Sequence, residues 1–170
     1  MHNQQTEIEY DLDALIRNRF ALEQQDIRTY SPLTLAYVGD AIYELILRSI
    51  VVRQGNKQVN KLHRQASRFA KAQAQSEMVE TLFPLLLEEE VQIYKRGRNA
   101  KSYTTAKNAS VNDYRRATGF EALMGYLYLN GNTQRLVELV KTAVESYTPE
   151  EHTGMETRNR CEQRQIKEEV

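Results

Sequence analysis

Two acidic side chains lie in segments that are otherwise apolar. Asp40 lies in "LAYVGDAIYEL" and Glu121 in "ATGFEALMGYLYL", and both segments have the composition of buried helices. An unpaired carboxylate is costly in such a setting. Small residues accompany each acid at short spacing, which lets helix axes approach closely: Ala36, Gly39 and Ala41, and Gly119, Ala122 and Gly125. The two carboxylates are therefore candidate ligands of one shared Mg²⁺, which prefers oxygen ligands and needs only one or two from the protein.

A structural role is the alternative for both acids. An acid on a helix is commonly satisfied by an ion pair with Arg or a hydrogen bond from Tyr, and periodicity alone favours that interpretation. Glu44 follows Asp40 by one helical turn, so the two can share a face. Three roles stay open for Glu44: a third metal ligand, an outer partner of the site, or an acid in a salt bridge.

A basic segment, "YKRGRNAKS", precedes the segment that carries Glu121. Its Lys95, Arg96, Arg98 and Lys101, with Lys107 beyond, are predicted to lie in a loop and to contact a phosphate backbone. A solvated lysine-rich loop is the alternative. The formal net charge of zero conceals an uneven pattern, because residues 48–116 hold fourteen Lys and Arg against six Asp and Glu. Such a basic middle suits a polyanionic partner.

Other chemistries find few residues. The single cysteine, Cys161, lies near the end of the chain, and of the three histidines only His63 lies in the body. The sequence has neither GxxxxGK[ST] nor GxGxxG, so the common nucleotide-binding motifs are excluded. A single cysteine supports no disulfide framework and suits the reducing cytoplasm. The polar N-terminus predicts no signal peptide, and no apolar run is long enough for a membrane span.

The elements that must position these residues are predicted to be helices. The chain is expected to be all-α, with about six or seven helices and no strand. Ser31 followed by Pro32 is typical of an N-cap and first helical position, and predicts a helix from Pro32 to Arg53 that ends at Gly55. Further helices are predicted over 7–24 and from a cap at Asn60 to about residue 83. A short helix is predicted after Pro84, ending near Gly97. The last two are predicted from a cap at Asn112 or Asp113 to Asn130, and over 133–147.

Composition divides the chain into three parts. Residues 1–29 form an N-terminal extension with one helix, residues 30–147 form a helical domain, and residues 148–170 form a charged, partly disordered tail. The apolar stretch from Ile42 to Ile50 suits a dimer surface, but it could equally be monomer core.

Four segments resemble a known family. They are, in this order, "LAYVGDAIYEL", "KLHRQASRFAKAQAQ", "YKRGRNAKS" and "YRRATGFEALMGYLYL". Over about residues 30–147 the chain resembles Mini-ribonuclease III, the short branch of the ribonuclease III family that has no double-stranded-RNA-binding domain. The resemblance implies a ribonuclease III-like helical endonuclease domain. It also implies a homodimeric, Mg²⁺-dependent endoribonuclease that cuts double-stranded RNA, with the Mini branch associated with maturation of the 5′ and 3′ ends of 23S ribosomal RNA.

The resemblance also assigns site residues. The catalytic Asp of the family's "GD" motif falls on Asp40, and its Glu falls on Glu121 in "FEAL". The wider family has further carboxylates at two positions where this chain has Ala36 and Thr118. One shared Mg²⁺ is therefore expected rather than a full two-metal site.

Two rival functions remain open: a non-catalytic RNA-binding protein on the same fold, and a helical adaptor in which Asp40 and Glu121 form structural ion pairs. The resemblance favours the nuclease. Its expected partners are duplex RNA, namely precursor 23S ribosomal RNA, and a second copy of the chain, with a ribosomal protein as a further candidate. Its expected location is the cytoplasm.

Overall fold

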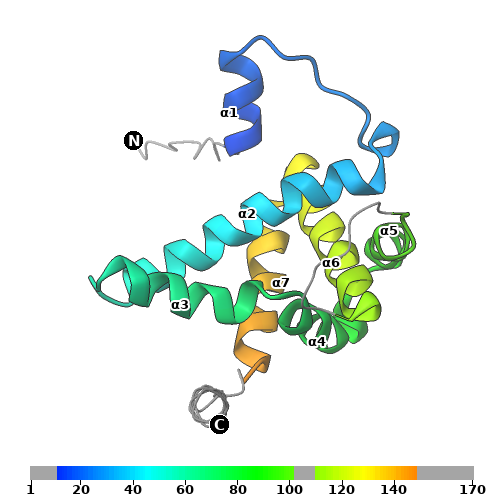
Figure 1. Ribbon diagram of the computed structural model, residues 1–170. Helices are drawn as coiled ribbons and strands as arrows, with labels where there is room; N and C mark the ends of the chain where they lie inside the picture. Colours follow the sequence, from blue (N-terminus) through cyan, green and yellow to red (C-terminus); the bar gives the residue numbers. More distant parts are fainter. Residues whose placement is uncertain (1–10, 102–109, 149–170) are drawn as a thin grey trace, which may run out of the picture.

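The computed structural model describes residues 11–101 and 110–148. These residues form seven α-helices and no strand, which confirms the predicted all-α class (Figure 1). The helices are α1 (Leu12–Arg19), α2 (Pro32–Arg53), α3 (Val59–Ala70), α4 (Ala72–Leu82), α5 (Glu88–Arg98), α6 (Val111–Leu129) and α7 (Thr133–Ser146). No helix in these two described ranges is long and apolar enough to cross a bilayer.

Helix α6 is the centre of the fold. Its residues from Ala117 to Tyr128 are buried, apart from the half-buried Glu121. Helices α2, α4, α5 and α7 all pack against it, and Figure 1 shows α6 between them. The ring of Phe120 meets the ring of Tyr43 edge-to-face, with centroids 5.0 Å apart. The core is thus organised around the helix that carries one of the two candidate metal ligands.

Helix α2 begins and ends as predicted. The Ser31 hydroxyl accepts a hydrogen bond from the Thr34 amide at 3.0 Å, Pro32 occupies the first turn, and Gly55 follows the helix with a φ of 141°. A positive φ of this size favours glycine because other residues adopt it only with strain. The inner face of α2 holds the buried side chains Leu35, Tyr43, Leu47 and Val51, while Leu33, Tyr37, Leu45 and Val52 are exposed.

The single helix predicted from Asn60 to about residue 83 is wrong. The chain forms α3 and α4 instead, separated at Lys71, which is extended with φ −65° and ψ 144°. Two buried side chains stabilise the break. The Tyr43 hydroxyl donates to the Phe69 carbonyl oxygen at 3.0 Å, and the Gln75 amide donates to the Ala70 carbonyl oxygen at 3.1 Å. Tertiary hydrogen bonds therefore override a local sequence that favours a continuous helix.

The predicted ends of two other helices need correction. Helix α6 is capped by Ser110, not by Asn112 or Asp113, because the Ser110 hydroxyl accepts from the Asp113 amide at 3.0 Å. Helix α1 is shorter than the predicted 7–24. Residues 20–24 are not helical, and residues 7–10 lie outside the described ranges. At its start, the Asp11 carboxylate accepts a hydrogen bond from the Thr133 hydroxyl at 3.2 Å, which links α1 to the beginning of α7.

Candidate active site

The site begins at the crossing of α2 and α6, where two glycines bring the backbones into contact. A Cβ atom built on Gly39 would lie 1.7 Å from the carbonyl oxygen of Glu121. A Cβ atom built on Gly125 would lie 2.0 Å from the carbonyl oxygen of Leu35. No side chain fits at either position, because van der Waals contact requires more than 3 Å. The predicted close approach of the two helices is therefore observed, and glycine is its cause.

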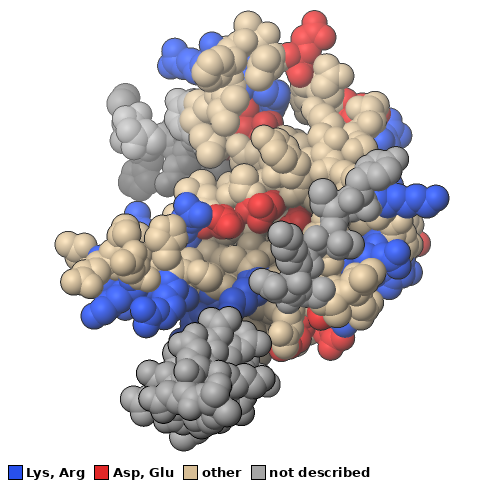
Figure 2. Space-filling model, in the orientation of Figure 1, with Lys and Arg blue, Asp and Glu red and all other residues tan. Residues whose placement is uncertain are grey.

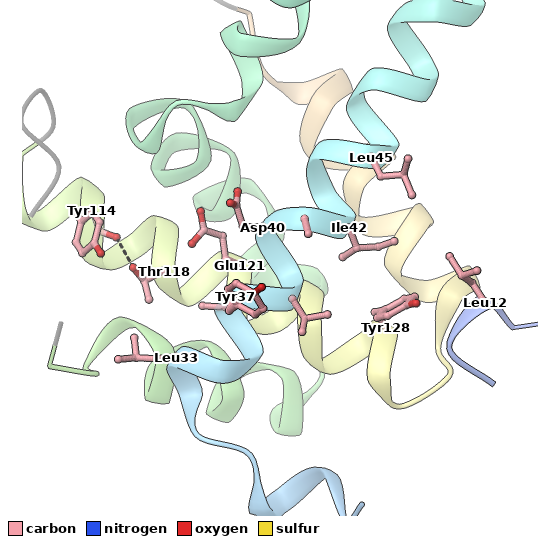
Figure 3. A pocket seen from close by; sticks show the side chains of 13 residues that line it. Leu12, Leu33, Tyr37, Asp40, Ile42, Leu45, Tyr114, Thr118, Glu121 and Tyr128 are labelled. Atoms are coloured by element: carbon pink, nitrogen blue, oxygen red, sulfur yellow. Dashed lines mark hydrogen bonds between the residues drawn. The ribbon is translucent and has the colours of Figure 1, made fainter. Parts of the chain in front are cut away.

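The crossing brings Asp40 and Glu121 together. Asp40 follows Gly39 directly, and Glu121 supplies the carbonyl that Gly39 contacts. Both acids line one open cavity of about 770 Å³. Figure 3 shows their carboxylates reaching toward the same space from α2 and α6, with Tyr37 and Thr118 nearby. Two carboxylates from two different helices thus line the same cavity.

The electrostatics of this pair favour a bound cation. Burial and then the negative charge of Asp40 raise the pKa of Glu121 to about 8, against the opposite effect of a hydrogen bond with Gln75. Partial burial and the charge of Glu44 raise the pKa of Asp40, whereas Arg48 lowers it. Ionisation of both carboxylates is therefore unfavourable when no cation is near. A hard divalent cation would relieve this cost and suits a donor set made only of oxygen.

Glu44 forms an ion pair with Arg48, one turn further along α2. Of its three open roles, the observed contact is that of an acid in a salt bridge. In the described ranges, no group of three His, Cys, Asp or Glu side chains has an arrangement that could hold a metal ion. The carboxylates that line the cavity are Asp40 and Glu121, and Glu44 does not line it.

Ala36 and Thr118 lie beside the pair, where the wider family is expected to have further acids. Both residues line the same cavity, and both are buried, with 6% and 7% of their surface exposed. The Thr118 hydroxyl donates to the carbonyl oxygen of Tyr114 at 3.0 Å, within its own helix (Figure 3). The site is therefore sparse, with two acids at its centre and neutral side chains at the neighbouring positions.

The predicted basic loop is partly a helix. Lys95, Arg96 and Arg98 lie at the C-terminal end of α5, where cations interact favourably with the helix dipole, and Glu88–Glu90 occupy its first turn. Lys101 follows the helix and is exposed, while Lys107 lies outside the described ranges. The predicted helix end near Gly97 is therefore confirmed, whereas the loop predicted for these cations begins only after Arg98.

A second glycine contact fixes the end of α5 against α6. A Cβ atom on Gly97 would lie 2.7 Å from the Cβ of Ala122 and 3.0 Å from the Cα of Gly119. Ala122 is the residue after Glu121. The cations at the end of α5 are thus held close to the helix that carries a candidate metal ligand.

A further set of cations was not identified as a candidate site from the sequence. Helix α3 carries exposed Lys61, Arg64 and Arg68 at spacings of three and four, and Lys71 follows it. Residues at these spacings lie on one helix face. Figure 2 shows blue side chains along α3, on the same view in which a row of acidic side chains crosses the middle of the molecule. The spacing of these Lys and Arg residues, which places them on one side of a helix, could have predicted this basic face from the sequence.

Comparison with known proteins agrees with the geometry. The family model described as "Ribonuclease III domain" matches residues 33–132. A Mini-ribonuclease 3 of Clostridium tetani is 47% identical over 125 residues, which cover 73% of this chain and 83% of that protein. A Mini-ribonuclease 3 of a Thermoanaerobacter species is 44% identical over 138 residues, which cover 81% of this chain and 97% of that protein.

A solved structure extends the agreement to the fold. A crystal structure of a Fusobacterium nucleatum protein is 30% identical and superposes with a TM-score of 0.65, covering 72% of this chain and 98% of that chain. The family match includes Asp40, Glu121 and the glycine crossing between them. The chain therefore belongs to the ribonuclease III family of endoribonucleases, in its Mini-ribonuclease 3 branch.

Proposed function

We propose that the chain is a Mg²⁺-dependent endoribonuclease that cleaves double-stranded RNA and trims the 5′ and 3′ ends of precursor 23S ribosomal RNA in the cytoplasm. The observation that supports the metal most directly is the pair Asp40 and Glu121, two carboxylates brought together where Gly39 contacts α6. We assign the activity to residues 30–147, with residues 1–29 and 148–170 as extensions.

The chemistry assigned to the pair is phosphodiester hydrolysis. Asp40 and Glu121 would hold Mg²⁺, which when bound polarises the scissile phosphate and activates water at neutral pH. Because Glu121 is half-buried, the proposed reaction would take place at the edge of the core, where electrostatic interactions are stronger than in bulk water. The neutral neighbours Ala36 and Thr118 support one protein-held ion, so any second ion would depend on phosphate and water oxygens.

Two groups of basic side chains are proposed to contact the RNA backbone, on either side of the cleaved bond. The first group is at and after the end of α5: Lys95, Arg96, Arg98, Lys101 and Lys107. The second is the basic face of α3. A-form RNA is recognised mainly through its shape, its phosphates and its 2′-hydroxyls. A helical nuclease domain can therefore select a duplex without reading its bases.

A homodimer is the proposed assembly. The outer face of α2 exposes Leu33, Tyr37 and Leu45, of which Tyr37 is 81% exposed, and all three line the cavity that holds the acid pair. Contiguous exposed apolar surface marks an interaction site in a protein of this size. Two-fold symmetry would give one active site per subunit and allow both strands to be cut. A ribosomal protein that presents the RNA remains a candidate further partner.

The deciding experiment incubates the purified protein with precursor 23S ribosomal RNA and Mg²⁺, followed by mapping of the RNA ends. Asp40→Asn is the matched variant, because it removes the charge and keeps the size of the side chain.

The wild-type protein is expected to cut near both ends of the mature sequence. The variant is expected to bind the RNA and to lose roughly 10²–10³-fold in rate, the range that is typical when one group that stabilises the charge of the transition state is removed. Undiminished cleavage by the variant would remove Asp40 from the site. Binding without cleavage by the wild type would favour the non-catalytic RNA-binding protein.

A further inference from the structure

Thr118 places a buried hydroxyl group beside the acid pair. It lies three residues before Glu121 on α6 and lines the same cavity as Asp40 and Glu121. Residues three apart in a helix lie on one face. Figure 3 shows the side chains of Thr118 and Glu121 projecting from α6 toward this cavity. A neutral oxygen atom of the protein is therefore available next to the two carboxylates.

The observed hydrogen bond of Thr118 uses only the donor of its hydroxyl group. The Oγ1 atom donates to the Tyr114 carbonyl oxygen at 3.0 Å, one turn earlier in α6. A hydroxyl group has one donor and two acceptor lone pairs. Because its hydrogen atom is directed at a main-chain carbonyl, Oγ1 has only lone pairs to present to the cavity. Thr118 can thus accept a hydrogen bond in the cavity while it keeps the bond to Tyr114.

Water bound to a divalent cation is a donor that suits such an acceptor. Mg²⁺ demands octahedral geometry and usually keeps several water molecules when one or two carboxylates bind it. A cation held by Asp40 and Glu121 would therefore carry water on its remaining positions. The charge of the ion polarises this water and strengthens the hydrogen bonds that it donates. An acceptor that lines the cavity of the acid pair would orient one of these water molecules.

A role within the helix is the alternative for this hydroxyl group. Ser and Thr in helices can bond to the carbonyl oxygen four residues earlier without any further function. Thr142 on α7 provides the comparison, because its hydroxyl group donates to the Glu138 carbonyl oxygen at 3.1 Å. It makes the same local bond as Thr118 but does not line the cavity. A property that Thr118 has and Thr142 lacks can therefore be ascribed to the acid pair.

On these grounds we propose that Thr118 is a positioning residue for the proposed metal site, and that its hydroxyl oxygen accepts a hydrogen bond from a water molecule bound to the cation. The neutral hydroxyl group orients this water without adding a further like charge to the acid pair. This role rests on the proposed function, because it requires that Asp40 and Glu121 bind a divalent cation. Partners that act on a metal site without touching the metal typically change metal affinity or activity by roughly 10–100-fold when removed.

The test measures Mn²⁺ binding to the full chain without RNA, by the electron paramagnetic resonance signal of free Mn²⁺. Thr118→Val replaces the hydroxyl group by a methyl group of similar size, and Thr118→Ser keeps the hydroxyl group. Thr142→Val is the matched control, because it removes the same local bond from another helix. Thr118→Val is expected to bind Mn²⁺ about tenfold more weakly, whereas Thr118→Ser and Thr142→Val are expected to bind like the wild type. Thr118→Ala repeats the measurement if Thr118→Val fails to fold.

Three outcomes would overturn the proposal while the metal site stands. Wild-type affinity in Thr118→Val would show that the hydroxyl group does not act on the cation. Equal weakening in Thr118→Ser would show that the methyl group matters instead, and equal weakening in Thr142→Val would ascribe the effect to a lost helix bond. A wild-type protein that binds no Mn²⁺ at millimolar concentrations would refute the metal site, and the role of Thr118 with it.

Discussion

Gly39 contacts the backbone of Glu121 so closely that a single methyl group on Gly39 would overlap the Glu121 carbonyl oxygen, at 1.7 Å. The contact joins the helix that carries Asp40 to the helix that carries Glu121. It has the consequence that the spacing of the two acids is set by main chain against main chain, and the first prediction tests this relationship.

Gly39→Ala is expected to destabilise the fold by about 3 kcal/mol, the upper end of what overpacking a core costs, because backbone atoms on α6 must move. Gly97→Ala is expected to cost less, since its nearest atom is the Ala122 side chain at 2.7 Å. Chemical denaturation of both variants provides the measurement. An unfolding free energy for Gly39→Ala equal to that of the wild type would contradict the close contact.

Stability without metal is expected to depend on pH through Glu121. The pKa of Glu121 is raised from 4.5 to about 8 in the folded chain, so the folded state retains this proton where the unfolded state has lost it. The free energy of unfolding should therefore fall as the pH rises from about 4.5 to about 8. Denaturation at pH 5 and pH 8 in a chelator should show a larger fall for the wild type than for Glu121→Gln. Identical pH dependence in the two proteins would contradict the raised pKa.

Two sets of cations are expected to contribute to RNA affinity. The paired variants Arg96→Gln with Arg98→Gln, and Arg64→Gln with Arg68→Gln, should each weaken binding and flatten its salt dependence. Each lost phosphate contact lowers the slope by about 0.9 in a B-form duplex, and a similar value is expected here. The measurement uses the Asp40→Asn background, so that the RNA stays intact. Lys141→Gln is the control, because Lys141 lies on α7 and pairs with Glu145. A slope that stays unchanged in one pair would exclude that helix from the RNA surface.

The outer face of α2 is expected to hold the dimer together. Tyr37→Asp and Leu45→Asp should shift the protein to a monomer, because each places a charge in exposed apolar surface that a partner would cover. Val137→Asp is the control, since Val137 is 47% exposed on a different helix, α7, and does not line the cavity. Sedimentation equilibrium gives the mass in each case. Dimers in all three variants would require a different interface.

The start of α2 was predictable because Ser31 with Pro32 is a local signal whose meaning does not depend on the rest of the fold. The approach of Asp40 and Glu121 was expected from the small residues near each acid, such as Gly39 and Gly119, but their role as metal ligands came from the family resemblance. Ser110 was also a readable signal, because Ser110 with Asp113 three residues later is a typical N-terminal pattern.

The break at Lys71 was not predictable in this way. The residues around it favour a helix, and what stabilises the break is hydrogen bonding by Tyr43 and by Gln75. Tyr43 lies 26 residues before the carbonyl it binds. The burial of Gln75 was not predictable for a related reason, since "AKAQAQSEM" contains two glutamines in α4 and only the fold buries one of them.

The sparse acid pair also bears on the order in which the proposed RNA and metal could bind. Ala36 and Thr118 are neutral, so the carboxyl groups that line the cavity are those of Asp40 and Glu121. The raised pKa of Glu121 further limits the negative charge of this surface when no cation is near. Repulsion of a polyanion grows with each like charge it approaches, and it is screened at physiological salt. A duplex can therefore approach this surface before a cation has neutralised it, so the substrate's own phosphate oxygens can take part in assembling the site.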